Sequence, residues 1–274
     1  MNNQSVANSA NHYNRVSAES VIAVKKKDDV IIEVVNLLHR FPDGTAGVDR
    51  ISLSIRRGAF VIMAGPNGSG KTTLLRHFNG LAMPSAGTVK INGISVKENL
   101  VRARRVVGMV FQDADSQIVG ETVSEDVAFG PENLGMDPSE IDSRTRWALE
   151  KVGLSHMTDA APHFLSGGEK RRLAVAGVLS MKPEIIVFDE PFSNLDYPGI
   201  CQVVEQMRTL HAEGHTIVVA SHDLDPVIGL ADRLIFLNRG RVVRDGEPAI
   251  VAPDAALFGI RPVTGFMPRE ERVL

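Results

Sequence analysis

The sequence has little cysteine and no long apolar run. Its one cysteine, Cys201, excludes a disulfide within the chain and suits a protein kept in a reducing cytoplasm. No apolar stretch approaches the ~20 residues that a membrane-spanning helix needs, so we expect any association with a membrane to come through a partner. Residues 1–29 are polar and lack an apolar segment, which favours a flexible extension over a signal peptide.

A strong charge of either sign is also missing. The formal net charge of -3 gives no general reason to expect binding to nucleic acid or to anionic lipid. The basic clusters at residues 25–27 and 102–105 are therefore interpreted as solvated surface. With 274 residues, the chain is long enough to bury a sizeable core.

One glycine-rich segment matches the phosphate-loop pattern G-x-x-x-x-G-K-[ST]. An apolar run at residues 59–64 precedes it and a helical pattern follows from Leu74, a context that a chance match would lack. Glycine lets N–H groups approach phosphate oxygens, and the helix start adds its dipole. We expect Lys71 to contact the β- and γ-phosphates and the Thr72 hydroxyl to bind Mg²⁺. The predicted ATP-binding residues here are Gly65, Pro66, Asn67, Gly68, Ser69, Gly70, Lys71, Thr72 and Thr73.

Two carboxylates end a second apolar run. Residues 185–188 have the composition of a buried strand, and Asp189 and Glu190 follow directly. In open parallel sheets ligands bind at the carboxyl ends of strands, the edge from which the phosphate loop also leaves. Asp189 is therefore predicted to assist Mg²⁺, and Glu190 to orient or deprotonate the attacking water. Without the phosphate loop, both would be interpreted as solvated charges.

A third element, Leu165-Ser166-Gly167-Gly168-Glu169, opens a helix that continues to Met181. Ser166 and Glu169 have the spacing of a capping box, which offers a purely structural explanation. That explanation leaves the two glycines unexplained, because each costs about 1 kcal/mol against alanine within a helix. Close approach of a phosphate to this helix N-terminus would account for them.

These three elements, in this order, resemble the nucleotide-binding subunit of an ATP-binding cassette (ABC) transporter. The resemblance implies that Ser166, Gly167, Gly168 and Glu169 form a signature that acts on ATP held by a second subunit. Hydrolysis would then need a head-to-tail dimer, formed with the same chain or with a second ABC ATPase. Position 169 departs from the family pattern, in which glutamine is more usual.

The resemblance assigns four further residues. Phe41 stands where the family places a ring that stacks on adenine, although a lone aromatic beside a turn often only packs. Gln112 corresponds to a glutamine that binds Mg²⁺ and couples the site to the membrane subunit, and His222 to a histidine that contacts the γ-phosphate. Asp196 belongs to the segment that crosses the dimer interface, with an Asx turn as the structural alternative.

A narrower resemblance covers residues 111–135, which are similar to the ATPases of energy-coupling factor importers. That group energises the uptake of cobalt, nickel, biotin and other vitamins. Asp113 and Ala114 replace the usual Asn and Pro. The resemblance implies two kinds of membrane partner, a transmembrane coupling protein and a substrate-binding membrane protein, and a place at the cytoplasmic face of the cell membrane.

The predicted fold is α/β, a P-loop core of mostly parallel sheet flanked by helices, with an antiparallel β subdomain and a helical signature subdomain. The β-forming residues 30–35 and 51–55 flank the turn at 42–44, and Asn92-Gly93 is a hairpin signal. Helical spacing around 141–152 puts the helical subdomain at about 121–180. We expect an extension at 1–29, the ATPase domain at 30–250 and a tail at 251–274.

The expected function is hydrolysis of Mg·ATP to drive an importer of cobalt or nickel ions or of a vitamin. The alternative is a soluble ABC ATPase that remodels a complex without transport. Members of that kind commonly carry two sets of motifs or a long coiled-coil insertion, and neither is present in these 274 residues. The sequence does not identify the solute, which would contact only the membrane subunits.

Overall fold

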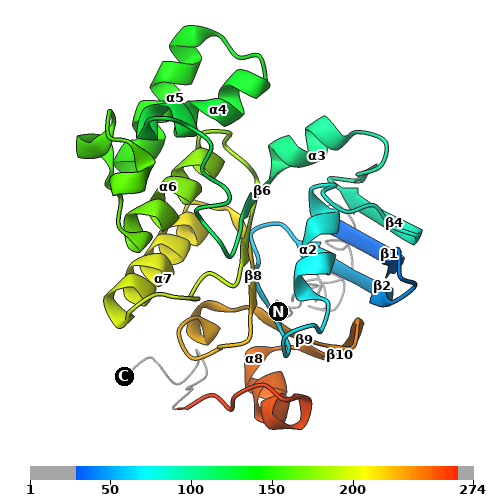
Figure 1. The fold of residues 1–274 in the computed structure, drawn as a ribbon. Coiled ribbons are helices and arrows are strands. Elements are labelled where there is room, and N and C mark those ends of the chain that lie inside the picture. The colour runs from blue at the N-terminus through cyan, green and yellow to red at the C-terminus, as the bar shows by residue number, and fades with distance from the viewer. Residues whose placement is uncertain (1–28, 265–274) are drawn as a thin grey trace, which may run out of the picture.

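Two sheets and a lobe of helices make up the molecule (Figure 1). The computed structural model describes residues 29–264. The predicted extension 1–29 lies outside this range except for Asp29, as do residues 265–274. Within the described range, no helix is both long and apolar enough to cross a bilayer.

The smaller sheet is antiparallel, as predicted. Its four strands, in the order β2-β1-β4-β5, are β1 (Val30–Arg40), β2 (Ala46–Arg56), β4 (Ala86–Ile91) and β5 (Ile94–Ser95). Asn92 (φ 49°) and Gly93 (φ 75°) both have the positive φ that a tight hairpin turn between β4 and β5 requires. The turn between β1 and β2 is closed by the bond from Phe41 N to Thr45 O, 2.9 Å.

The larger sheet has six strands in the order β10-β9-β3-β8-β7-β6. They are β3 (Phe60–Ala64), β6 (Val107–Val110), β7 (Ile185–Asp189), β8 (Thr216–Ser221), β9 (Arg233–Asn238) and β10 (Arg241–Gly246). Only β10 runs antiparallel to its neighbour. Every residue of β3, β6, β7 and β8 is buried, which explains why continuous apolar runs rather than alternation mark them in the sequence.

The helices fall into three groups along the chain. Two follow strands β3 and β5: α2 (Lys71–Phe78) and α3 (Leu100–Val106). Three lie between β6 and β7, inside the range predicted for the helical subdomain: α4 (Val123–Asn133), α5 (Pro138–Lys151) and α6 (Gly167–Leu179), with short 3₁₀ turns at Ser155–Met157 and Pro162–Phe164. They form the green lobe at the upper left of Figure 1. The capping box of Thr122 and Glu125 starts α4, and Pro138 at the first position starts α5.

The third group lies after β7. It comprises α7 (Tyr197–Ala212), α8 (Pro248–Val251) and the 3₁₀ segments at Ile228–Leu230 and Ala252–Phe258. Val251, Ala252, Ala255 and Ile260 are buried in the same core as the larger sheet. The packed part of the chain therefore extends at least to Ile260, beyond the boundary expected at residue 250.

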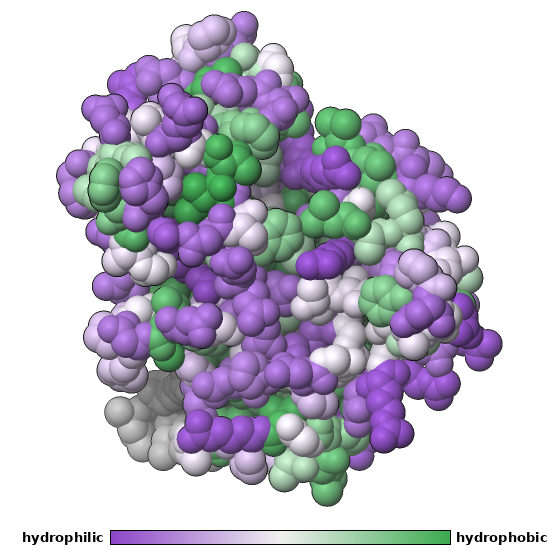
Figure 2. All heavy atoms as spheres, in the orientation of Figure 1, coloured by the Kyte–Doolittle hydropathy of each residue, from purple (hydrophilic) through white to green (hydrophobic). Residues whose placement is uncertain are grey.

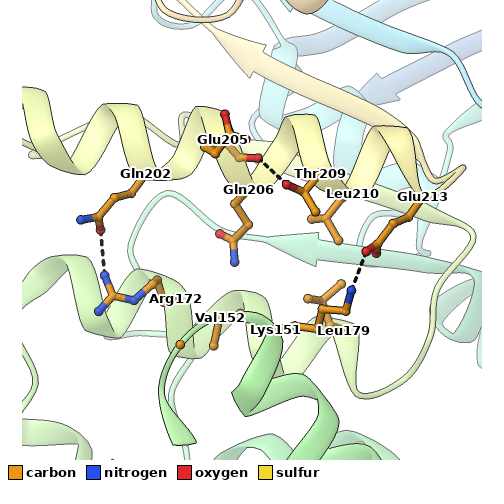
Figure 3. A pocket seen from close by; sticks show the side chains of 11 residues that line it. Lys151, Val152, Arg172, Leu179, Gln202, Glu205, Gln206, Thr209, Leu210 and Glu213 are labelled. Atoms are coloured by element: carbon orange, nitrogen blue, oxygen red, sulfur yellow. Dashed lines mark hydrogen bonds and ion pairs between the residues drawn. The ribbon is translucent and has the colours of Figure 1, made fainter.

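A cavity of about 480 Å³ separates α7 from α5 and α6 (Figure 3). Two polar contacts bridge it: Lys151 Nζ to Glu213 Oε1 at 2.5 Å, and Arg172 Nη1 to Gln202 Oε1 at 2.8 Å. Figure 3 shows Gln206 pointing from α7 into the space between them. The helical lobe and the core are thus joined along this seam by polar contacts, and none of the predicted site residues lines it.

Candidate nucleotide-binding site

The phosphate loop leaves the carboxyl end of β3, as predicted, and two of its three glycines are needed for packing. A Cβ at Gly65 would lie 2.3 Å from the Leu237 carbonyl oxygen, and one at Gly70 would lie 2.4 Å from that of Gly47. Gly70 also has φ 102°, which disfavours any side chain. Gly68, by contrast, faces open space, and Asn67 beside it is exposed. The loop backbone therefore packs closely against neighbouring backbone at Gly65 and Gly70 and is exposed between them.

The polar groups of the loop suit an anion. Helix α2 starts after Gly70 without a side-chain cap on its first N–H groups. The Ser69 hydroxyl oxygen is buried without a hydrogen-bond partner among residues 29–264. Lys71 Nζ is buried 2.7 Å from the Gly65 carbonyl oxygen, so its charge lies inside the loop. Uncapped N–H groups, an unpaired hydroxyl and a buried ammonium together fit phosphate oxygens.

Asp189 reaches the phosphate loop from β7. The Thr72 hydroxyl donates to its Oδ1 at 2.9 Å, although 117 positions separate the two residues. Burial raises the pKa of the Asp189 carboxyl, the negative charge of Glu190 raises it further, and the Thr72 bond opposes the shift. The sequence prediction that both residues would serve one metal site is consistent with this contact.

Glu190 lies at the centre of the cluster. Its Oε1 forms an ion pair with Lys71 Nζ at 3.1 Å but makes no hydrogen bond, and its Oε2 lies 2.8 Å from Nδ1 of His222. The carboxylate is buried, whereas the His222 side chain is 55% exposed. Glu190 also has φ 47°, a left-handed conformation that costs a residue with a Cβ on the order of 1 kcal/mol. The backbone is held there by the bond from Glu190 N to Ala220 O, 2.9 Å.

The donor set fits magnesium better than a metal held by protein alone. Among the described residues, no three His, Cys, Asp or Glu side chains gather where they would hold an ion. Mg²⁺ prefers oxygen ligands and usually takes one or two from the protein, with water and substrate phosphate supplying the rest. The Thr72 hydroxyl and the Asp189 carboxylate are such a pair.

Phe41 packs beside the phosphate-loop helix. A Cβ at Gly47 would lie 2.8 Å from the Phe41 ring and 3.1 Å from Cγ2 of Thr73, so the ring rests on the backbone of Gly47 next to Thr73. The residue remains 42% exposed. Part of the ring therefore packs, as the structural alternative has it, and part is exposed; stacking on adenine stays a prediction.

Gln112 is exposed in the loop after β6, next to Phe111, and within residues 29–264 no hydrogen bond joins it to Thr72 or Asp189. Gln117 of the same loop, which the sequence analysis included only within the segment 111–135 and gave no role, holds the start of this loop. Gln117 Oε1 accepts from Phe111 N at 3.0 Å and its Nε2 donates to Met109 O at 3.3 Å. No sequence pattern marks a side chain that acts on backbone groups in this way.

The signature segment has the capping box that its spacing predicts. Ser166 N and Oγ donate to Glu169 Oε2 at 2.8 and 2.7 Å, and this hydroxyl bond lowers the pKa of Glu169. Among residues 29–264, a Cβ at Gly167 or Gly168 would meet no atom within 4 Å. Packing within the chain therefore gives no reason for either glycine. Asp196 caps α7 by accepting from Gly199 N at 2.9 Å, which is the structural alternative weighed for it.

Arg171 connects the signature helix to both neighbouring loops, and the sequence analysis did not identify this role. Its guanidinium donates to the carbonyl oxygens of Phe111, 3.2 Å, and of Ser193, 3.3 Å. The side chain is buried, and burial lowers its pKa. One residue of α6 thus ties together the loop that carries Gln112 and the loop that carries Asp196.

The structure gathers one group of predicted residues and leaves another apart. Lys71, Thr72, Asp189, Glu190 and His222 form a connected cluster. Within the described chain, no hydrogen bond or ion pair joins Ser166, Glu169 or Asp196 to that cluster.

Comparison with known proteins agrees with the fold and the motifs. A family model described as ABC transporter matches residues 48–193. The energy-coupling factor transporter ATP-binding protein EcfA of Methanocaldococcus jannaschii is 43% identical over 227 residues, 82% of this chain and 81% of the relative. EcfA of Methanothermobacter thermautotrophicus is 43% identical over 247 residues, which are 89% of this chain and 79% of that relative.

Solved structures lead to the same family. The structure of cbiO1 from Clostridium perfringens, described as part of the ABC transporter complex cbiONQ, has a TM-score of 0.75 at 35% identity, and the match covers 84% of this chain and 93% of cbiO1. An ATP-binding cassette solved as a dimer with ADP and Pi has a TM-score of 0.72 at 28% identity, covering 80% and 99%. The chain therefore belongs to the ABC transporter family, as an ATPase subunit of the energy-coupling factor type.

Proposed function

We propose that this chain hydrolyses Mg·ATP at the interface of an ATPase dimer to energise an importer of cobalt or nickel ions or of a vitamin. The observation that carries the catalytic part is the cluster of Lys71, Thr72, Asp189, Glu190 and His222 at the carboxyl ends of parallel strands. The names of the relatives EcfA and cbiO1 support the transport part.

The proposed division of labour is electrostatic. Lys71 and the N–H groups of the loop hold the phosphates, and Thr72, Asp189 and Gln112 hold Mg²⁺. Bound Mg²⁺ would neutralise charge on the β- and γ-phosphates. Glu190 accepts a proton from the attacking water or orients it, since its carboxylate is buried beside the loop. His222 holds Glu190 Oε2 and is exposed enough to contact a γ-phosphate.

The signature completes the site of a second subunit. Gly167 and Gly168 are open to solvent contact, so a phosphate held by another chain has access to the start of α6. A dimeric ATP-binding cassette among the structural neighbours supports this arrangement. Asp196, exposed at the start of α7, would lie at the same interface.

An apolar groove is proposed to take a helix of the membrane subunit. It has a volume of about 530 Å³ and lies between α3, the loop after β6 and the helical lobe. Figure 2 shows hydrophobic side chains on both of its walls. Four of its lining residues are large, apolar and 49–66% exposed: Leu81, Val101, Val119 and Phe129. Phe111 and Gln117 line it too, so an occupant would touch the loop that carries Gln112.

The test is co-purification from membranes in mild detergent. We expect the tagged chain to recover polytopic membrane proteins, and Phe129→Asp to lose them while its affinity for ATP is unchanged. Leu257→Asp is the matched control, because Leu257 is 74% exposed and does not line the groove. Recovery of soluble partners alone would favour the soluble remodelling ATPase instead, and retention of membrane proteins by Phe129→Asp would remove the groove from the proposal.

A further inference from the structure

Three rings form a short stack between the predicted base site and the phosphate-loop helix. The His39 ring lies edge-to-face against Phe41, with centroids 5.0 Å apart and planes at 80°. His39 also contacts His77 on α2, with centroids 4.9 Å apart and planes at 77°. Both are favourable geometries for ring pairs. His39 therefore contacts both the exposed Phe41 and the helix that begins with Lys71.

His39 is held in place by the loop that follows α2. Its Nδ1 lies 3.1 Å from the Met83 carbonyl oxygen, so this nitrogen carries the proton and donates it. The backbone on either side is fixed as well: Ser85 N donates to Leu38 O at 2.8 Å, and Arg40 N donates to Ser85 Oγ at 2.9 Å. Three bonds to one loop leave the His39 ring little freedom to turn away from Phe41.

His77 fixes the other end of the stack. It is 1% exposed, and its Nδ1 lies 2.7 Å from the carbonyl oxygen of Thr73, the last of the ATP-binding residues predicted in this segment. Burial lowers the pKa of His77 and the nearby His39 lowers it further, while the hydrogen bond to Thr73 opposes the shift, so burial favours the neutral ring. Within residues 29–264, its Nε2 has no hydrogen-bond partner. Position and packing, not charge, are what His77 supplies.

The Phe41 backbone is also constrained. Gly44 N donates to Phe41 O and Phe41 N to Thr45 O, both at 2.9 Å, and Asp43 Oδ1 accepts from Thr45 N and Oγ1 at 2.9 and 2.6 Å. With the turn closed, the ring direction depends on the side-chain torsions. Gly47 limits the ring on one side and His39 meets it edge-on.

We propose that His39 is a positioning residue that holds the Phe41 ring in the orientation that stacks on the base of an adenine nucleotide. Through His77, it ties that ring to the helix of Lys71 and Thr72, so the base and phosphate contacts keep a fixed spacing. The inference rests on the proposed stacking role of Phe41, and the experiment separates the two.

The experiment compares two ligands by calorimetry with the full chain. Mg·ATP has a base and Mg·tripolyphosphate has none. We expect His39→Ala to weaken Mg·ATP binding about two- to tenfold, the range that one lost ring contact gives, and to leave Mg·tripolyphosphate unchanged. His156→Ala, an exposed histidine of the helical lobe outside the stack, is the control.

Two further variants separate the ring of His39 from its hydrogen bond. His39→Phe keeps an aromatic ring whose edge can contact Phe41, so it should retain most of the ATP affinity. His39→Asn keeps a hydrogen-bond donor near Met83 O but has no ring, so it should lose ATP affinity as His39→Ala does. If His39→Ala weakens both ligands equally, its role is structural and the proposal fails. If Phe41→Ala weakens ATP binding while His39→Ala does not, Phe41 stacks on the base but His39 does not position it, and the inference fails alone. If Phe41→Ala leaves ATP unchanged, stacking at Phe41 and the inference fail together.

Discussion

Glu190 combines three features at the scale of a single residue: burial, a left-handed backbone and two charged or ionisable neighbours. A strained conformation persists only where its surroundings enforce it, and here the bond from Glu190 N to Ala220 O does so. In this backbone conformation the Glu190 carboxylate lies between Lys71 Nζ and Nδ1 of His222. These are the surroundings expected for a general base next to a phosphate site.

Glu190→Gln should bind ATP and turn it over about 10²- to 10⁴-fold more slowly, because the amide cannot accept the proton of the attacking water. Steady-state phosphate release, with nucleotide binding measured in parallel, gives both quantities. Glu184→Gln is the control, since Glu184 is exposed and pairs with Arg57 away from the cluster. Turnover at the wild-type rate in Glu190→Gln would remove the residue from catalysis.

Asp189 illustrates a cost in stability. Because the folded-state pKa lies above the ordinary 3.8, the folded protein binds the proton more readily than the unfolded chain. The buried charge of Asp189 therefore destabilises the folded protein most at pH values above its folded-state pKa, and this destabilisation disappears as the pH falls toward 3.8. Asp189→Asn keeps an acceptor for Thr72 without the buried charge. It should raise Tm at pH 7.5 by roughly 2–4 °C, on the order of 1 kcal/mol, and abolish ATP hydrolysis.

The gain in Tm for Asp189→Asn over the wild type should shrink as the pH is lowered. Asp43→Asn should behave oppositely, because the hydrogen bond from the Thr45 side chain lowers the pKa of Asp43. The Asp43 carboxylate stabilises the folded state above pH 3.8, and this stabilisation is lost as the pH falls through the lowered pKa. Thermal unfolding of both variants across pH checks the pair of signs; equal behaviour would contradict the assignment of Asp189.

At the scale of elements, sequence reasoning succeeds where burial is complete. Strands β3, β7 and β8 are apolar at nearly every position; β3 ends directly before the first glycine of the phosphate loop, and β7 and β8 end in polar residues, so both their ends and their role were predictable. Strand β10 was not identified, because it lies at the edge, is half-exposed and carries arginines. The contact between Thr72 and Asp189 followed from the rule that parallel strands share one ligand edge.

Residues that act on backbone carbonyls escaped prediction. Arg171 and Gln117 hold loops through main-chain atoms, and His39 holds its place through Met83 O. A carbonyl is present at every position, so the sequence gives no partner whose type or spacing would reveal the contact. Their roles depend on how distant segments fold together, which motif patterns do not encode.

Arg171→Lys should lower the free energy of unfolding by about 1–3 kcal/mol, because an ammonium cannot serve the Phe111 and Ser193 carbonyls in the same fork and leaves one unpaired. ATP hydrolysis should fall as well, since both loops lose their common tie. Denaturant unfolding and phosphate release measure the two effects. Arg172 makes a single side-chain hydrogen bond, to Gln202, so Arg172→Lys should stay within about 0.5 kcal/mol of the wild type.

At the scale of the whole molecule, contacts within one chain account for the phosphate loop and the strand-end carboxylates but not for the signature glycines. The phosphate loop and the strand-end carboxylates contact one another, whereas a Cβ added at either signature glycine would meet no atom of residues 29–264 within 4 Å. Glycine in the first turn of α6 lowers helix stability without any packing benefit within the chain. Such a cost is expected where another molecule must approach the backbone, as at the interface of an ATPase dimer.

This argument predicts opposite effects on stability and on turnover for one substitution. Gly168→Ala should stabilise the isolated chain by up to about 1 kcal/mol, because its Cβ meets no atom within 4 Å and alanine is the better helix former. The same methyl group would stand where the phosphate of a second subunit approaches, so ATP hydrolysis should fall at least about tenfold if that contact stabilises the transition state.

Gly177 provides a matched control in the same helix. A Cβ there would meet its nearest atom, the Asp126 carbonyl oxygen, at an ordinary 3.8 Å, so Gly177→Ala should gain similar stability and keep its turnover. Thermal unfolding and phosphate release, measured on both variants without membrane partners, distinguish the two positions. If Gly168→Ala hydrolyses ATP as fast as Gly177→Ala, no second subunit approaches the start of α6, and the openness of Gly167 and Gly168 needs another explanation.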